Sequence, residues 1–158
     1  YSTCFWYNVL TSQTLHDPEG WYQSLVDRSQ RPYPDPLVQS VIEKNHPILR
    51  STISSYRHQI ERAIAKQDRV SINHRTAALL ASYFDILFAI NRQPHPGEKR
   101  LVTFARQHCQ YLPQNFEDEV NNLMDSAASL DGQVLIQIDT LVDDLDALLK
   151  RLGYVQPL

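Results

Sequence analysis

The segment from Ile72 to Ile90 is the most hydrophobic in the chain and constrains the fold more than any other feature. Its apolar residues recur every three or four positions, which is the spacing of one face of an α-helix. The main stripe consists of Ala77, Leu80, Phe84, Leu87 and Ile90. It is widened by Ala81, Phe88 and Ala89. A helix that is apolar over so much of its circumference needs neighbours on several sides. We therefore predict that it lies at the centre of a helical bundle.

Other segments repeat the helical spacing on both sides of this one. The clearest predicts a last helix of about five turns, through Val134, Ile138, Leu141, Leu145, Leu148 and Leu152. Shorter helices are predicted after Asp17-Pro18, after Asp35-Pro36, from Pro47 through Ile53 to Ile64, from Leu101, and after Asn115. Because proline lacks an N–H, we expect Asn45-His46-Pro47 to end one helix and open the next. The predicted fold is all-α, a bundle of about six or seven helices.

Length and charge exclude several classes of protein. A chain of 158 residues fits one domain. A net charge of −3 gives no electrostatic reason to expect binding to nucleic acid or to an anionic membrane. No apolar run approaches the roughly 20 residues that cross a bilayer. Cys4 and Cys109 are isolated and are expected to be reduced thiols, with a bridge left open, so we expect a cytoplasmic protein.

Large aromatic residues crowd the first positions of the chain. They are Tyr1, Phe5, Trp6 and Tyr7. Such residues are usually covered in a folded protein. We therefore expect the chain to be a fragment of a longer protein, with residues 1–17 as a remnant of an upstream unit and residues 18–158 as the helical bundle.

The sequence contains no complete catalytic site. It has no glycine-rich phosphate loop, no G-x-S-x-G elbow and no H-E-x-x-H motif, so we assign no catalytic residue and no metal ligand. The last predicted helix carries an acidic strip of Asp139, Asp143, Asp144 and Asp146. The strip could hold a cation but is better interpreted as the solvated face of that helix.

Four histidines could suggest chemistry, but none has a convincing set of partners. His58 with Glu61, and His108 with Cys109, lack a third ligand in the sequence. His16 precedes Asp17-Pro18, and His46 precedes Pro47. Both are interpreted as residues at helix boundaries.

The connection after the central helix is the best candidate for a binding site. Between Asn91 and Arg100 it combines two prolines, a glycine, a histidine and three basic residues. Backbone amides that open the next helix, together with basic side chains, could hold an anion such as phosphate. The other interpretation, a basic helix–helix corner without a ligand, stays open. The candidate substrate-binding residues are Asn91, Arg92, His95, Lys99 and Arg100.

Several segments resemble one known group of proteins. The runs Trp6–Thr11 and Leu15–Gly20 look like the junction between the catalytic core and the helical domain of bacterial nucleotidyltransferase-fold proteins. Asn73–Arg92, followed by His95–Arg100, is similar to that helical domain, which has no known function and is compared with the C-terminal bundle of kanamycin nucleotidyltransferase. The resemblance covers roughly residues 6 to 105 and is most specific at Asn91–Arg100.

The resemblance implies an accessory role rather than catalysis. The family's chemistry belongs to a Gly-Ser turn followed by paired aspartates on a strand, which bind two metal ions and the nucleotide. This chain has no Gly-Ser pair, and Asp144-Leu145-Asp146 lies on a predicted helix. The chain would then be a domain that needs the upstream nucleotidyltransferase core as partner and helps to form the pocket for the nucleotide or a small-molecule acceptor. Mg²⁺ and a nucleoside triphosphate are expected only with that core, of which residues 1–17, with Leu15-His16 as a last short strand, would be the remnant.

Two other functions stay open. The chain could be a protein–protein interaction module that binds through Phe5-Trp6-Tyr7 or through the terminal leucine seam. It could instead be an RNA-binding or RNA-cleaving helical domain of a toxin–antitoxin type system. Such domains carry an arginine and a histidine about five residues apart in one helix, whereas Pro94 separates Arg92 from His95 here.

Overall fold

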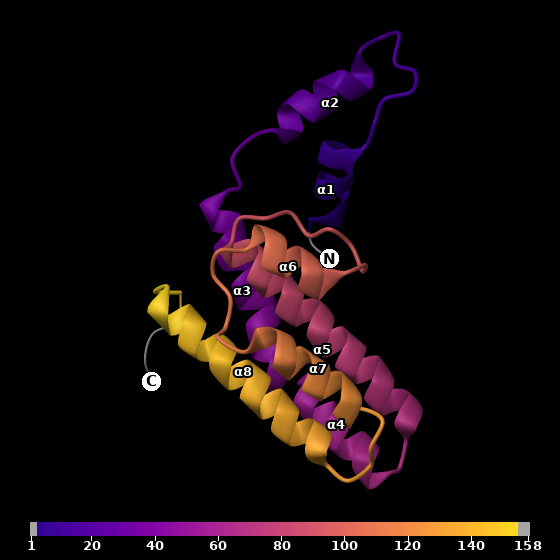
Figure 1. Cartoon of the computed structure of the whole chain (residues 1–158), viewed down its shortest axis with the longest axis vertical. Helices are drawn as coiled ribbons and strands as arrows, with labels where there is room; N and C mark the ends of the chain where they lie inside the picture. The colour runs from indigo at the N-terminus through magenta and orange to yellow at the C-terminus, as the bar shows by residue number, and fades with distance from the viewer. Residues whose placement is uncertain (1–2, 155–158) are drawn as a thin grey trace.

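A computed structural model describes residues 3–154 of the chain, and within them it contains eight α-helices and no strand (Figure 1). The helices are α1 (Cys4–Thr11), α2 (Trp21–Ser29), α3 (Asp35–Arg50), α4 (Tyr56–Ala65), α5 (Arg69–Ile90), α6 (Leu101–His108), α7 (Phe116–Ser126) and α8 (Gln133–Arg151). The prediction of an all-α bundle is confirmed.

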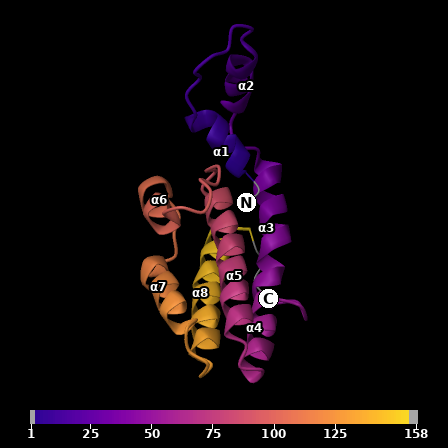
Figure 2. The ribbon, with the colours of Figure 1, turned by 90° about the vertical axis from the view of Figure 1, so that its right-hand side faces the viewer.

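Helix α5 forms the centre of the bundle. Every residue from Ser82 to Ile90 is buried, as expected for a helix that is apolar on all sides. It packs against α3 and α4 on one side and against α6 on the other (Figure 2). The start of its predicted stripe behaves differently, because Ala77 and Leu80 remain partly or fully accessible at a cleft.

Helix α8 closes the bundle with its leucine seam turned inward. Five members of the predicted seam are buried, namely Val134, Ile138, Leu141, Leu145 and Leu148. The helix packs against α7 and α4. This apolar face is therefore already covered within the chain, and binding of another protein stays a prediction.

The predicted helix break at Pro47 is also wrong. Helix α3 continues through Pro47 to Arg50 and holds Leu49 in the core with no exposed surface. A proline costs the helix one backbone hydrogen bond, and burial of the next turn offsets that cost. The chain instead breaks after Arg50, where Ile53 is 90% exposed rather than on an apolar helix face. Ser55 then caps α4 by accepting a hydrogen bond from the His58 N–H.

The proline inside α3 gives a stability prediction. Replacing Pro47 by alanine restores a backbone N–H in mid-helix and removes the ring from the preceding turn. We expect the free energy of unfolding to rise by about 2 kcal/mol, which is the usual proline penalty of about 3 kcal/mol less about 1 kcal/mol for the greater freedom of the unfolded chain. Urea denaturation measures the change. A loss of stability would show that this helix depends on the bend at Pro47.

The N-terminal helices form an arm that projects beyond one end of the bundle (Figure 1). Leu15-His16 lies in the loop between α1 and α2 and is not a strand, because no neighbouring strand is present in the described chain to pair with it. Helix α2 begins at Trp21 rather than after Asp17, although the Asp17 carboxylate accepts a hydrogen bond from the Gln23 N–H at 2.9 Å.

Aromatic contacts fasten the base of the arm to the bundle. Trp6 stacks on Tyr33 with 5.2 Å between ring centroids and donates its indole N–H to the Ser29 carbonyl oxygen at 2.7 Å. Tyr7 meets Phe104 edge-on at 5.5 Å. Trp6 and Tyr7, two of the aromatic residues at the start of the chain, are therefore covered by contacts within the chain. Tyr1 lies outside the described residues.

Apolar side chains remain exposed along the rest of the arm. They are Phe5 at 82%, Leu15 at 96% and Trp21 at 70%.

Both cysteines are free thiols. From residue 3 to residue 154, no helix has the combination of length and apolarity that crossing a membrane would require.

Candidate functional site

The loop from α5 to α6 lies at the end of the bundle where the arm is attached (Figure 1). Its first predicted site residue, Asn91, joins two parts of the chain. Its side-chain amide donates to the carbonyl oxygens of Leu87 and Tyr111, each at 2.8 Å, and its Oδ1 accepts from the Tyr111 N–H at 2.7 Å. These bonds fix the end of α5 to the segment before α7, so Asn91 has a structural role.

Arg92 is also engaged within the chain. Its backbone has φ 53°, a left-handed conformation at the end of the helix. Its guanidinium contacts the Asp35 Oδ1 atom at 2.6 Å through Nη2 and at 3.2 Å through Nε. The ion pair is exposed, and it ties the corner to the first residue of α3. The positive charge of Arg92 is thus partly neutralised before any ligand arrives.

His95 is buried beneath the loop, only 1% exposed. Its backbone N–H donates to the Thr3 hydroxyl at 2.8 Å, and its Nδ1 accepts from the Gly97 N–H at 3.0 Å. The ring packs edge-on against Phe88. Burial lowers the pKa of His95 to about 4, so the imidazole is neutral at pH 7 and adds no positive charge to the corner.

Lys99 and Arg100 are the two site residues that face solvent together. They are exposed and line a hollow of about 280 Å³ with Tyr7, Pro96 and Phe104. Arg100 precedes α6 with φ 54° and makes no side-chain cap bond to it. The first amides of a helix have no intrahelical acceptor, and they carry the positive end of the helix dipole. Two cations beside these amides suit an anion such as phosphate.

The acidic strip on α8 is more than the solvated face that the sequence predicted, because three of its partly exposed carboxylates pair with arginines of other helices. The Arg57 guanidinium bonds both oxygens of Asp139, at 2.7 and 2.8 Å. Arg50 contacts Asp143 at 2.6 Å and Asp146 at 2.7 Å. This pairing is not visible in the sequence, because the arginines lie on α3 and α4 and the aspartates on α8.

His46 belongs to the same network rather than to a helix boundary. It lies inside α3, and its Nε2 contacts the Asp146 Oδ1 at 2.5 Å. Burial opposes ionisation of Asp146, but the hydrogen bonds from His46 and Arg50 outweigh it and lower the pKa of this carboxyl. Arginine and histidine thus occupy the oxygens that a cation would need.

The other pairs in the sequence show no reactive arrangement. The His58 Nδ1 lies 3.9 Å from the Glu61 Oε2 on the surface. His108 packs against Phe104 with 4.3 Å between ring centroids, and burial raises the pKa of the neighbouring Cys109 thiol to about 12. A protonated thiol is a poor nucleophile. In the part of the chain that the structure describes, no three histidine, cysteine or acidic residues are grouped to hold a metal ion.

A buried carboxyl pair was missed from the sequence. Glu119 on α7 is 6% exposed, its Oε2 makes no hydrogen bond, and its carboxyl interacts with that of Asp144 on α8. Burial, then Asp144, raises the pKa of Glu119 to about 7. The Tyr83 hydroxyl is buried and has no hydrogen-bond partner. One signal was present: Glu119 lies on the apolar stripe of α7, between Phe116 and Leu123.

Comparison with known proteins identifies one family. The model of a domain of unknown function, DUF4037, matches residues 7–101, which is more than half of the chain. The matched region runs from the middle of α1 to the first residue of α6 and therefore includes most of the arm, the central helix and the whole corner. No curated protein and no solved structure matches the chain.

Proposed function

The chain belongs to the DUF4037 family. From its sequence resemblance and from the corner at Asn91–Arg100, we propose that it is the accessory helical domain of a nucleotidyltransferase-like protein. In this proposal a separate catalytic core performs the transfer. The helical domain binds the core through its arm and supplies basic groups to the pocket for the nucleotide or the acceptor. It transfers no nucleotide by itself.

One observation carries the proposal, namely the position of Lys99 and Arg100. They line the hollow together with Tyr7, which belongs to the arm. The first backbone amides of α6 follow directly after them in the chain. Positive charge and unpaired amides are what a phosphate group requires. A core bound to the arm would place its nucleotide close to these groups.

The arm itself supports a docking role. Phe5 on α1, Leu15 in the following loop and Trp21 on α2 are largely exposed. These elements form the arm, which lies at the end of the bundle that carries the corner (Figure 1). Exposed apolar groups that lie close together mark interaction sites more often than isolated ones do. The resemblance of the same segment to the junction between core and helical domain agrees with this role.

We expect a thermal shift experiment to detect the anion site in this chain. At 100 times its dissociation constant, ATP, GTP or inorganic phosphate should stabilise the fold by about 2.7 kcal/mol, or roughly 5–10 °C in a domain of this size. The double variant Lys99→Gln/Arg100→Asn should abolish the shift. Asparagine is chosen at position 100 because it tolerates positive φ.

The matched control is Arg92→Gln, which removes an arginine that Asp35 already neutralises and should keep most of the shift. A double variant that retains the full shift would place the anion elsewhere. Nucleotide transfer catalysed by the purified chain alone would overturn the accessory role.

A second function has its own observation. If none of the three anions changes the melting temperature, the exposed apolar arm favours a protein–protein interaction module instead. That module would bind through Phe5, Leu15 and Trp21, since Trp6 and Tyr7 are engaged with Tyr33 and Phe104.

A further inference from the structure

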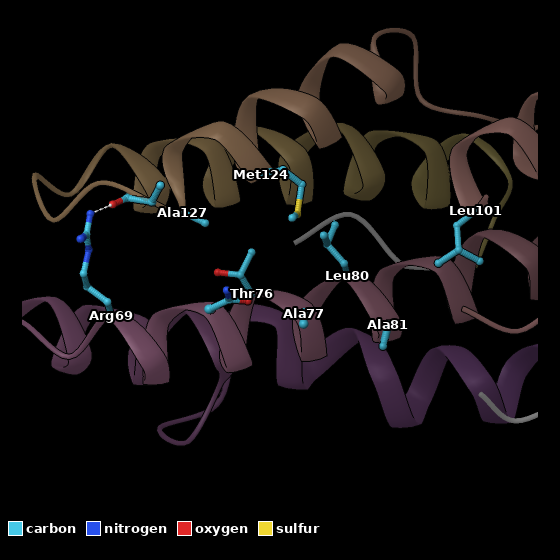
Figure 3. A pocket seen from close by; sticks show the side chains of 10 residues that line it. Arg69, Thr76, Ala77, Leu80, Ala81, Leu101, Met124 and Ala127 are labelled. Carbon is cyan, nitrogen blue, oxygen red and sulfur yellow. Dashed lines mark hydrogen bonds between the residues drawn. The ribbon is translucent and has the colours of Figure 1, made fainter. Parts of the chain in front are cut away.

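The first half of α5 and the facing side of α7 leave an open cleft of about 410 Å³ between them (Figure 3). Its walls carry small side chains, which allow the cleft to exist: Ala77, Ala81, Ala127 and Ala128. Leu101 from α6 lines it at one end. The volume falls within the range of about 300–1,000 Å³ that small organic ligands occupy in proteins.

Thr76 gives the cleft a buried polar group without a partner. The residue is 1% exposed, and its Oγ1 makes no hydrogen bond. Its side chain points from α5 into the space below α7 (Figure 3). A threonine in a helix can usually bond to the carbonyl one turn earlier. Buried hydroxyls are rarely left unbonded, and this one is positioned to bond to a molecule that enters the cleft.

The two ends of the cleft differ in polarity. At one end the Arg69 guanidinium donates to the Ala128 carbonyl oxygen at 2.8 Å, which holds it at the mouth (Figure 3). This bond uses one of the five N–H donors of an arginine. At the other end lie Leu80, Leu101 and Met124, and Met124 is 50% exposed. No acidic residue is among the described residues that line the cleft.

We infer that this cleft binds a small amphiphilic anion. A carboxylate or phosphate group of the ligand contacts Arg69, a polar atom next to it bonds the Thr76 hydroxyl, and an apolar body covers Leu80, Leu101 and Met124. The cleft shares no residue with the corner at Asn91–Arg100. The inference goes beyond the proposed function and holds whether or not the chain serves a nucleotidyltransferase.

The chain contains a single methionine, so one methyl signal reports on the cleft. With ¹³C-methyl-methionine in the protein, we would titrate octanoate and octyl phosphate below their micelle concentrations and follow Met124 by NMR. Both should shift the signal saturably. Octanol, which has the same tail without charge, should bind at least several-fold more weakly. Inorganic phosphate should leave the signal unmoved, because it lacks the apolar body. The relative affinity of octanoate and octyl phosphate shows which headgroup the site prefers.

Variants locate the ligand within the cleft. Arg69→Gln should weaken octanoate binding about tenfold, which corresponds to about 1.4 kcal/mol. Arg75→Gln is the matched control, because Arg75 is an exposed arginine of the same helix that does not line the cleft. Thr76→Val keeps the side-chain shape and should also weaken binding. Ala77→Leu fills the cleft with a good helix former and should abolish binding without loss of the helix.

Four results would overturn the inference. The first is that neither amphiphile shifts the Met124 methyl signal. The second is that Arg75→Gln weakens binding as much as Arg69→Gln, which would indicate general charge attraction. The third is that Ala77→Leu binds octanoate as tightly as the unaltered chain. A Met124 signal that moves with protein concentration alone would also overturn it, because a second copy would then cover the cleft.

Discussion

Replacing Phe88 by alanine is expected to lower the free energy of unfolding by about 3–5 kcal/mol, the usual cost of emptying a buried aromatic site. Phe88 is 1% exposed, and its ring contacts three others: it packs edge-on against His95 at 4.9 Å and Phe104 at 5.4 Å, and stacked with Phe84 at 5.8 Å. The substitution therefore removes contacts between α5, the corner loop and α6 together. Urea denaturation measures the loss.

The chain offers a matched control for this substitution. Phe5→Ala makes the same chemical change at a side chain that is 82% exposed, and it should alter stability by no more than about 0.5 kcal/mol. A second readout is the pKa of His95, which burial keeps at about 4 and which should rise in Phe88→Ala as water reaches the ring. Equal losses in the two variants would contradict the packing described for α5.

Glu119→Gln is expected to stabilise the chain by about 1–3 kcal/mol at pH 8 and by much less at pH 5. The pKa of Glu119 is raised to about 7 in the folded chain, from an ordinary value of 4.5. The folded state therefore binds the proton more tightly than the unfolded state does. The stabilisation from that proton is fully present below pH 4.5 and is lost as the pH rises through 7. Glutamine keeps the shape and the neutral form at every pH.

Unfolding by urea at pH 5 and pH 8 tests this expectation. Asp118→Asn is the control, because it removes an exposed carboxylate from the same helix. It should cost a few tenths of a kcal/mol at both pH values through the loss of an acidic group near the start of α7. A Glu119→Gln effect that does not change with pH would show that Asp144 and burial do not perturb the carboxyl.

The sequence predicted a ligand site at the corner and a solvated face at the acidic strip, and the structure changes both predictions. Among the five predicted site residues, Asn91, Arg92 and His95 are used to hold the chain together, and Lys99 and Arg100 remain available. The strip interpreted as solvated is instead bonded to bases on α3 and α4, which fixes α8 against them. Both differences have the same origin, since the partner of a charged residue is set by packing between distant segments.

Local periodicity determined much of this protein. The centre of the bundle at Ile72–Ile90 and the inward seam of α8 follow from apolar residues spaced at three and four, which a helix must bury on one side. Capping residues also act locally: Asp68 precedes α5, and its carboxylate accepts a hydrogen bond from the Ser71 N–H at 3.0 Å.

Only the tertiary structure decided features that depend on two distant segments. Pro47 stays inside α3 because burial of Leu49 outweighs one missing hydrogen bond. Glu119 is protonated more easily because packing buries it and because α8 brings Asp144 beside it. The cleft exists because alanines of α5 face the alanines that directly follow α7, about 50 residues further along the chain. A single segment records the preferences of its own backbone and side chains, whereas burial, charge pairing and empty volume belong to the packed arrangement.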